Sequence, residues 1–444
     1  MAGSAQREHW SSRTGFVMAA IGSAVGLGNM WRFSYLAAEN GGAAFVILYV
    51  ALTLLIGLPL LLAEMVIGRG AQQSPIRALA HFGGAGWKWL GGVFVAAGFL
   101  ILSYYSVIAG WTVRYAWIAL SRGFGANVAD RFGDISEGSD AFAFHLGFML
   151  VCTAIVAHGI KAGIERTSLL LMPVLFAIVV GLAFYAATLD GAGPGYAYYL
   201  SADFSKLAHA GVLKDAAGQA FFSLSLGMGA MLTYASYLGR DQNLPGESVV
   251  IAGVDLAVAF VAGLVVFPLI FALGLSDKVG ASTVGALFIT LPQAFAELGG
   301  VGRFVGALFF VALFVGALTS AMSLLEVVVS SAVDDFGWTR TRAAWTAGAA
   351  IAALGSFAAF DIGVLDVADQ VANNVLLLGG GLALCLFTGW AMPDPIGEAS
   401  AGAPGVRWFP AWRMLLRFVA PLFLGFVLVQ AVPETWRAVV GLIR

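Results

Sequence analysis

An apolar segment near the start of the chain, residues 16–38, is interrupted by glycines and polar side chains. The interruption reads GSAVGLGNMWR and holds three glycines within seven residues, followed by an asparagine and an arginine. Glycine lowers helix stability by roughly 1 kcal/mol relative to alanine, so this composition favours a break in the helix. Close packing of small residues against a neighbouring helix explains the same glycines. The stretch alone does not separate the two interpretations.

A second apolar segment carries a similar interruption. Residues 221–229 read FFSLSLGMG, with serine hydroxyls and a Gly-x-Gly inside the segment. Inside a bilayer, a broken helix is tolerated only where it is buried in protein or lines a cavity. Two glycine-interrupted segments at corresponding positions of two halves therefore predict a binding site near the bilayer midplane, as in transporters.

The composition is that of an integral membrane protein. Of the 444 residues, 60% are hydrophobic and 11% are charged, and the mean hydropathy is +0.89. The net charge of −2 says nothing about partners, but the lack of a basic run indicates no nucleic-acid partner. The polar N-terminal residues predict no cleaved signal peptide. Cys152 and Cys385 lie in apolar segments and are expected to be reduced packing residues.

Apolar runs able to cross about 30 Å of hydrocarbon recur along the chain and predict an all-α polytopic fold. We count eleven spans, which cover residues 14–37, 42–68, 88–121, 141–158, 167–189, 216–238, 249–275, 303–332, 341–358, 364–391 and 412–432. Residues 276–302 are expected to form an external loop with helical pieces. Residues 392–410 are expected to form a Pro/Gly-rich cytoplasmic link.

The links between spans predict the orientation. Basic residues such as Arg69, Arg240 and Arg342 gather on the side of the N-terminus, whereas the opposite side carries acids such as Asp134 and Asp190. The positive-inside rule then places the N-terminus in the cytoplasm, and an odd span count places the C-terminus outside.

The two interrupted spans, the first and the sixth, are five spans apart. An offset of five reverses the orientation, as an inverted-topology repeat requires. We therefore expect one transporter domain over residues 1–444. Its parts are a first repeat over about 14–189, a second over about 216–391, and the cytoplasmic link and last span over 392–444.

Four stretches occur in the order found in one known family: GSAVGLGNMWRF, ENGGAAF, GQAFFSLSLGMGAMLTYASY and GALTSAMS. They resemble the motifs of the neurotransmitter:sodium symporter family, most closely its bacterial transporters of leucine and other hydrophobic amino acids. The resemblance covers about residues 7–430. It implies two five-helix inverted repeats with broken helices 1 and 6, sodium coupling, alternating access and a bacterial inner-membrane location. Many members have twelve spans, so no oligomeric state is predicted here.

By this resemblance the substrate is a zwitterionic amino acid. Its carboxylate would meet a sodium ion, the Tyr105 hydroxyl and the amides of Leu27 and Gly28, because helix N-termini offer unpaired amides. Its ammonium would meet the carbonyls of Ala24 and Phe222 and a serine hydroxyl. From the residues alone, Tyr105 is more simply a packed aromatic side chain. The implied substrate-binding residues are Ser23, Ala24, Leu27, Gly28, Ile101, Tyr105, Phe222, Ser223, Ser225, Met228, Ser320, Ser323 and Leu324.

The implied pocket is apolar and holds no acid or base that could pair with a charged side chain, so it would select by volume. Met228 stands where the leucine-selective relative has phenylalanine, and methionine adapts to different shapes. Ser23 is smaller than the asparagine found there. We therefore expect hydrophobic L-amino acids, including aromatic ones.

The resemblance also implies two sodium sites built from oxygen ligands, which hard cations prefer. The first comprises the Ala24 carbonyl, Asn29, Ser223, Asp255 and the substrate carboxylate. The second comprises the carbonyls of Gly22, Val25 and Gly316 and the hydroxyls of Thr319 and Ser320. Without the resemblance, the last two hydroxyls would be expected to bond to the preceding helical turn.

Asp255 departs from the family pattern, which often has asparagine at this place. A charge at membrane depth costs at least ~2.5–3.5 kcal/mol, so it needs a partner, and a bound sodium ion is one. A protonated aspartic acid in ordinary packing is the alternative. Chloride-dependent relatives supply a negative charge here from Cl⁻, so we expect Asp255 to make transport chloride-independent.

Two gates follow from the same resemblance. Arg32 and Asp369, paired directly or through a water molecule, would close the outer side, with Asp366 nearby and Phe222 as a lid. Arg7 would pair with an acid on the inner side, surrounded by aromatic and hydroxyl side chains. The inner-gate residues are Arg7, Trp10, Ser236, Tyr237 and Asp334.

Gly163 and Pro173 share the fifth span, a spacing that in this family lets the inner end unwind; an ordinary proline kink explains it equally well. Glu64 is expected to tie helices together in the core. A sensor that binds without transporting, or a transporter of another small zwitterion, remains the alternative. An enzyme is not expected, because the apolar spans hold no metal-ligand cluster and no nucleophile–base pair.

Overall fold

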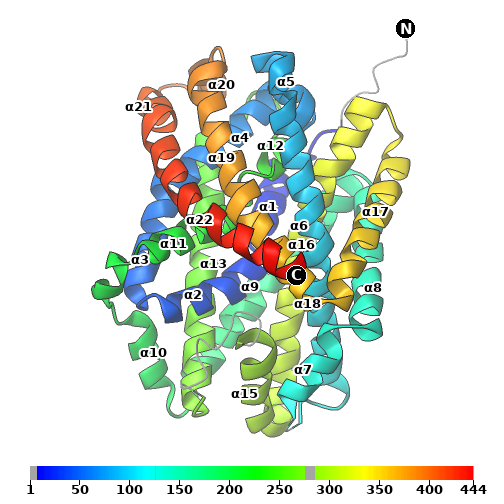
Figure 1. The fold of residues 1–444 in the computed structure, drawn as a ribbon, viewed down its shortest axis with the longest axis vertical. Coiled ribbons are helices and arrows are strands. Elements are labelled where there is room, and N and C mark those ends of the chain that lie inside the picture. The colour runs from blue at the N-terminus through cyan, green and yellow to red at the C-terminus, as the bar shows by residue number, and fades with distance from the viewer. Residues whose placement is uncertain (1–7, 126, 276–285, 444) are drawn as a thin grey trace.

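The computed structural model describes residues 8–125, 127–275 and 286–443, which are helical throughout and form no strand (Figure 1). One isolated bridge joins Gly42 and Ala202. The predicted all-α class is therefore confirmed. The ten residues 276–285, within the predicted external loop, lie outside the described residues.

Nine helical segments of the described chain are long and apolar enough to cross a membrane. They are Ala43–Ala71, Ala85–Ser121, Ser139–Ala157, Ile160–Ala187, Leu244–Ala272, Gly299–Phe336, Arg340–Phe360, Ile362–Ala391 and Phe409–Leu442. These nine match the predicted spans other than the first and the sixth, which are broken into shorter pieces. The fifth begins earlier than predicted, at Ile160, in the π-helical turn η4 (Ile160–Glu165) that precedes α9 (Arg166–Ala187).

The first broken helix consists of α1 (Arg13–Ala24), the π-helical turn η1 (Gly28–Arg32) and α2 (Phe33–Glu39). Between the first two, Val25 leaves the helical region with φ −76° and ψ 105°.

The second broken helix consists of α11 (Ala210–Ser223) and α12 (Ala230–Ala235). The turns between them need left-handed backbone at Ser225, Gly227 and Gly229, with φ of +54°, +77° and +71°. Glycine accepts such φ values at little cost, which explains the Gly-x-Gly of this segment.

The glycines of the first break also permit close approach. A Cβ on Gly22 would lie 2.9 Å from the Thr319 Cβ, and one on Gly26 would lie 2.6 Å from the Ser320 Oγ. A Cβ on Gly28 would meet the Phe222 ring at 2.7 Å. The two interpretations of this stretch therefore hold together: the helix breaks, and small residues let other helices pack against the break.

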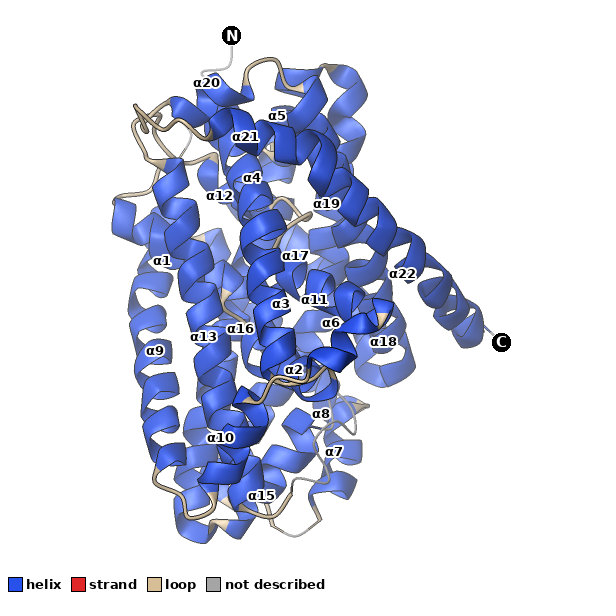
Figure 2. Ribbon diagram, turned by 90° about the vertical axis from the view of Figure 1, so that its left-hand side faces the viewer, coloured by secondary structure: helices blue, strands red, loops and turns tan. Residues whose placement is uncertain are grey.

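The breaks lie among the long buried helices α6 (Lys88–Ser121) and α16 (Gly299–Phe336). Helices α9 and α13 (Leu244–Ala272) form one edge of the molecule, while α8 (Ser139–Ala157) and α17 (Arg340–Phe360) form another (Figures 1 and 2). The remaining helices are α3 (Ala43–Leu52), α4 (Leu58–Ala71), α5 (Pro75–Gly83), α7 (Val128–Ser136), α10 (Ala192–Leu200), α15 (Leu291–Glu297), α18 (Ile362–Val371), α19 (Leu378–Leu386), α20 (Pro395–Ser400), α21 (Phe409–Met414) and α22 (Ala420–Ile443).

Candidate functional site

A pocket lies between the two helix breaks and is closed laterally by α6 and α16. It is lined by Ser23, Ala24, Gly26, Leu27, Gly28, Ile101, Tyr105, Phe222, Ser223, Ser225, Met228, Ser320 and Leu324. Twelve of these thirteen residues are among those that the sequence singled out for substrate. Gly26 is the addition. Ser323 does not line the pocket, but its hydroxyl accepts a hydrogen bond of 2.7 Å from Ser23.

One end of the pocket offers hydrogen-bond donors. The amide nitrogen of Leu27, at the resumption of the first broken helix, lies 3.5 Å from the Tyr105 hydroxyl. Amides at such a helix start have no partner in the preceding turn, and the helix dipole favours an anion there. This end can therefore bind a carboxylate.

Two hydrogen bonds, each from a side chain of the second broken helix to a backbone carbonyl of the first, join the two breaks. The Ser225 hydroxyl, held by its left-handed backbone, donates a hydrogen bond of 2.8 Å to the Ser23 carbonyl. The Gln219 side-chain amide donates one of 2.9 Å to the Gly28 carbonyl.

A buried cluster of oxygen atoms adjoins the first break on its α13 side. The Asp255 carboxylate accepts hydrogen bonds from the Ser223 hydroxyl at 2.9 Å, the Asn29 amide at 2.6 Å and the Tyr49 hydroxyl at 3.2 Å. Asp255 and Asn29 are both 0% exposed. The sequence placed Asn29, Ser223 and Asp255 in one site, and the structure brings them together; Tyr49 was missed.

A second cluster lies where α16 passes the end of α1. The Ser320 hydroxyl lies 3.3 Å from the Gly22 carbonyl oxygen and 3.1 Å from that of Gly316. The Thr319 hydroxyl lies 3.1 Å from the Gly316 carbonyl oxygen. Both hydroxyls thus bond to the preceding turn, as serine and threonine in helices usually do, and both stay beside the broken backbone.

The two clusters fit a hard cation. Their oxygen atoms are those of a carboxylate, hydroxyls and carbonyls, which alkali and alkaline-earth ions prefer to nitrogen or sulfur. No group of three or more His, Cys, Asp or Glu side chains that could hold a metal ion occurs in residues 8–125, 127–275 and 286–443.

On the outer side, the predicted partners Arg32 and Asp369 do not form a direct ion pair. The Arg32 guanidinium lies 5.5 Å from the centre of the Phe222 ring. The Asp369 carboxylate instead accepts a hydrogen bond of 2.7 Å from the Asn373 amide. Asp366 is exposed nearby on α18. The expected outer gate thus has no direct ion pair among the described residues, and a pairing through water stays a prediction.

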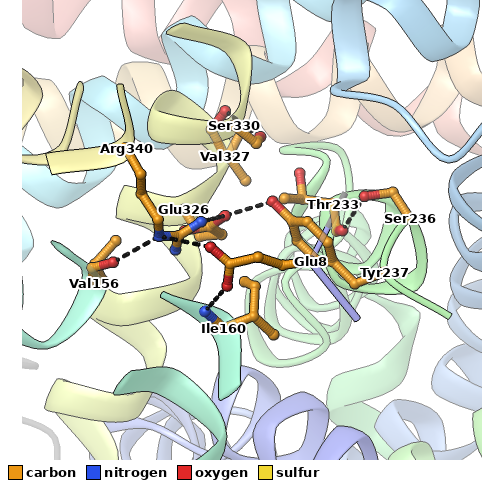
Figure 3. A network of polar contacts seen from close by, with 10 residues as sticks. All are labelled: Glu8, Val156, Ile160, Thr233, Ser236, Tyr237, Glu326, Val327, Ser330 and Arg340. Atoms are coloured by element: carbon orange, nitrogen blue, oxygen red, sulfur yellow. Dashed lines mark hydrogen bonds and ion pairs between the residues drawn. The ribbon is translucent and has the colours of Figure 1, made fainter. Parts of the chain in front are cut away.

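On the inner side, a buried acid that the sequence reading missed forms the centre of a polar network (Figure 3). The Glu326 carboxylate, on α16, is 0% exposed and pairs with Arg340 at 2.5 and 3.1 Å. The Tyr237 hydroxyl donates a hydrogen bond of 2.6 Å to the same carboxylate. Glu8 lies 3.7 Å from Arg340, so the network reaches the N-terminal segment. Because an acid in an apolar span is functional or paired, Glu326 was detectable from sequence.

The other predicted inner-gate residues surround this network. Trp10 donates a hydrogen bond of 2.9 Å to the Tyr234 carbonyl, and Ser236 one of 2.6 Å to the Thr233 carbonyl. Asp334 accepts a hydrogen bond of 2.6 Å from the Ser74 amide. Arg7, its predicted partner, lies outside the described residues.

Two carboxylates bind the N-terminal segment to the start of the fifth span. Glu165, at the end of η4, accepts hydrogen bonds from the Ser11 amide at 2.8 Å and the Ser11 hydroxyl at 2.5 Å. Glu8 accepts one of 2.6 Å from the Ile160 amide at the other end of η4. We call Glu8, Ser11, Ile160 and Glu165 the N-terminal clasp. This pairing was not predicted from the sequence.

Glu64 has the structural role expected for it. Its carboxylate, 0% exposed on α4, accepts hydrogen bonds from the amides of Gly227 at 2.9 Å and Leu232 at 3.2 Å. It thereby satisfies backbone groups that the second helix break leaves unpaired.

A helical membrane fold with two broken helices around a midplane pocket defines a membrane transporter rather than an enzyme. A profile of the sodium:neurotransmitter symporter family matches residues 7–127 and 135–438. The chain is 36% identical to the uncharacterized sodium-dependent transporter YhdH of Bacillus subtilis, over 95% of this chain and 97% of that protein. It is 34% identical to the uncharacterized sodium-dependent transporter MJ1319 of Methanocaldococcus jannaschii, over 95% of this chain and 90% of that protein.

Among solved structures, that of MhsT in complex with L-phenylalanine superposes with a TM-score of 0.88 at 41% identity, covering 96% of this chain and all of that one. The chain belongs to the sodium:neurotransmitter symporter family. The family assignment made from the four sequence motifs is confirmed.

Proposed function

We propose that the protein is a sodium-coupled symporter of hydrophobic L-amino acids, including aromatic ones, that works by alternating access. The observation that carries this proposal is the polarity of the pocket. Leu27 and Tyr105 offer donors at one end, and Ile101, Met228 and Leu324 offer only apolar side chains at the other. The L-phenylalanine in the related MhsT structure supports the same substrate class.

The two oxygen clusters are the proposed sodium sites. The first would use Asn29, Ser223 and Asp255 with the Ala24 carbonyl and the substrate carboxylate, so that substrate and sodium bind together. The second would use Thr319 and Ser320 with carbonyls of the broken backbone. Sodium bound there would hold α16 against the end of α1. We propose that loss of this sodium ion releases α1, the inner half of the first broken helix.

We further propose that the protein lies in the inner membrane of a bacterium with its N-terminus in the cytoplasm. The support is the excess of Lys and Arg on those links between spans that are expected on the same side of the membrane as the N-terminus. The inner side would then be closed by the N-terminal clasp and the Glu326–Arg340 network.

The test is uptake of labelled tryptophan and leucine into proteoliposomes, with an inward sodium gradient or with potassium in its place. Sodium-driven accumulation of either amino acid is expected. Sodium-dependent binding without accumulation would instead support a non-transporting sensor of the same fold. If a different zwitterion accumulates and neither amino acid binds, the proposed substrate class is wrong.

A further inference from the structure

A groove on the surface of the molecule, away from the pocket, takes no part in the proposed transport cycle. It lies between α8 and α17, which run side by side at one edge of the fold (Figure 1). Its volume is about 330 Å³. Apart from Thr153 its lining is apolar, and it consists of Leu146, Gly147, Met149, Leu150, Thr153, Trp345, Gly348, Ala349 and Ala352.

The floor and the opening of the groove come from two glycines. A Cβ on Gly348 would lie 2.2 Å from the Thr153 Oγ1, so this glycine lets the two helices touch. A Cβ on Gly147 would meet nothing within 4 Å, so the absence of a side chain there leaves the space open. Leu150 and Trp345 stand at its rim, 58% and 44% exposed. Apolar cavities stay free of water, so the occupant within a bilayer is hydrocarbon.

A basic side chain stands at one end of the groove. Arg342 precedes Trp345 and Ala349 by three and seven residues, which places it on the same helical face. Its guanidinium lies 4.7 Å from the centre of the Trp338 ring. Neighbouring Arg340 is paired with Glu326, but no ion pair of the described residues involves Arg342. An unneutralised arginine beside aromatic rings at the start of a membrane helix is placed to meet an anionic headgroup.

We propose that this groove binds an anionic phospholipid from the leaflet on the side of the N-terminal segment. One acyl chain lies between α8 and α17, and the headgroup phosphate meets Arg342. The dimensions agree, because the eight residues from Trp345 to Ala352 span about 10 Å of helix, within the roughly 15 Å depth of one leaflet. The side is fixed by Arg340, which begins α17 and lies 3.7 Å from Glu8.

The proposal is tested by native mass spectrometry of the purified transporter with phosphatidylglycerol or phosphatidylcholine added. Gly147→Phe adds a ring to the groove at a position where a Cβ meets nothing within 4 Å, and it is expected to remove the bound lipid. Gly181→Phe is its matched control, because Gly181 is also exposed in a membrane span and a Cβ there meets nothing within 4 Å. Arg342→Gln is expected to lower the preference for phosphatidylglycerol about fivefold, since one basic residue near a membrane surface contributes about 1 kcal/mol. Arg417→Gln is the control, because Arg417 likewise lies 5.0 Å from a tryptophan ring, that of Trp390.

Sodium-driven uptake by each variant reports on folding, and the mass of bound lipid reports on the groove. Failure of the lipid proposal can therefore be told apart from failure of the transport proposal. Equal lipid retention by Gly147→Phe and Gly181→Phe would overturn the groove as the site. Equal retention of both lipids, unchanged by Arg342→Gln, would overturn the anionic headgroup. A dimer lost only in Gly147→Phe would assign the groove to a second copy of the chain instead.

Discussion

Asp255 combines a negative charge with complete burial on α13. It accepts hydrogen bonds from Tyr49, Asn29 and Ser223, which offset part of the cost of a charge at membrane depth. A carboxylate fixed beside a cation supplies permanently the negative charge that a dissolved anion would otherwise supply. We therefore predict equal uptake in chloride and gluconate media, and a strong chloride requirement would contradict this.

The same geometry predicts the effect of Asp255→Asn. The amide keeps the size of the side chain but removes its charge, and Ser223 and Asn29 lose an ionised acceptor. Hydrogen bonds to charged groups contribute about 1.5–3 kcal/mol, so we expect the sodium concentration for half-maximal uptake to rise about tenfold or more. Sodium titrations of uptake measure this. Glu137→Asn is the control, because Glu137 is exposed and accepts a hydrogen bond from the Ile362 amide far from the pocket.

We propose that Met228 sets the size of the apolar end of the pocket. It is 2% exposed and lines the pocket together with Ile101. Met228→Phe replaces a flexible chain by a rigid ring, and one methylene of misfit is worth about 1–3 kcal/mol. We predict that the ratio of tryptophan to leucine uptake falls at least about tenfold. Met228→Leu, which keeps the side chain aliphatic, should leave the ratio near that of the parent, and an unchanged ratio in Met228→Phe would remove Met228 from the pocket.

At the scale of helices, the Glu326–Arg340 pair joins α16 to α17. Removing one partner of a buried pair leaves an uncompensated charge and typically costs about 3–5 kcal/mol, whereas replacing both partners by apolar residues is often neutral. We predict that Arg340→Met clearly lowers the thermal unfolding midpoint in detergent, and that Glu326→Met with Arg340→Met restores most of it. Arg77→Met is the control, since the side chains of Arg77 and its partner Asp335 are 47% and 21% exposed, and surface pairs are worth under about 1 kcal/mol. Equal losses in the single and double variants would contradict the prediction.

The helices themselves were predictable because their apolar runs reach span length. The two breaks were predictable because glycines and polar groups inside such runs conflict with an unbroken helix. The resemblance located most of the pocket, since its residues cluster in the quoted motifs. Glu8, Glu165 and Arg340 were missed because each lies near a polar link, where a charge needs no partner. Only the three-dimensional fold shows that these charges converge.

Across the whole molecule, the two sides of the pocket differ in how they are closed. On the outer side, Arg32 and Asp369 are not directly paired, and Phe222 lines the pocket. On the side of the N-terminal segment, the clasp and the buried Glu326 network form several charged hydrogen bonds, which we propose to close the path. In the proposed alternating access, these inner contacts would break while the outer charges meet. Because the N-terminal clasp binds the segment to η4, we propose that release of the segment accompanies any unwinding at the start of the fifth span.

This coupling predicts that weakening the clasp exposes the inner path. Glu165→Gln removes the negative charge of the carboxylate that accepts hydrogen bonds from the Ser11 amide and hydroxyl. Because these bonds weaken, the inward-open state should become more populated. The measurement is the labelling rate of Ser236→Cys, a buried position on the inner path, in a background lacking Cys152 and Cys385. We expect the rate to rise several-fold in Glu165→Gln, and likewise in Arg7→Ala, and added sodium to lower it again. Glu137→Gln, at the opposite end, should label like the parent. Unchanged labelling in Glu165→Gln would show that the N-terminal clasp does not control opening of the inner side. The Glu326 network alone would then keep that side closed.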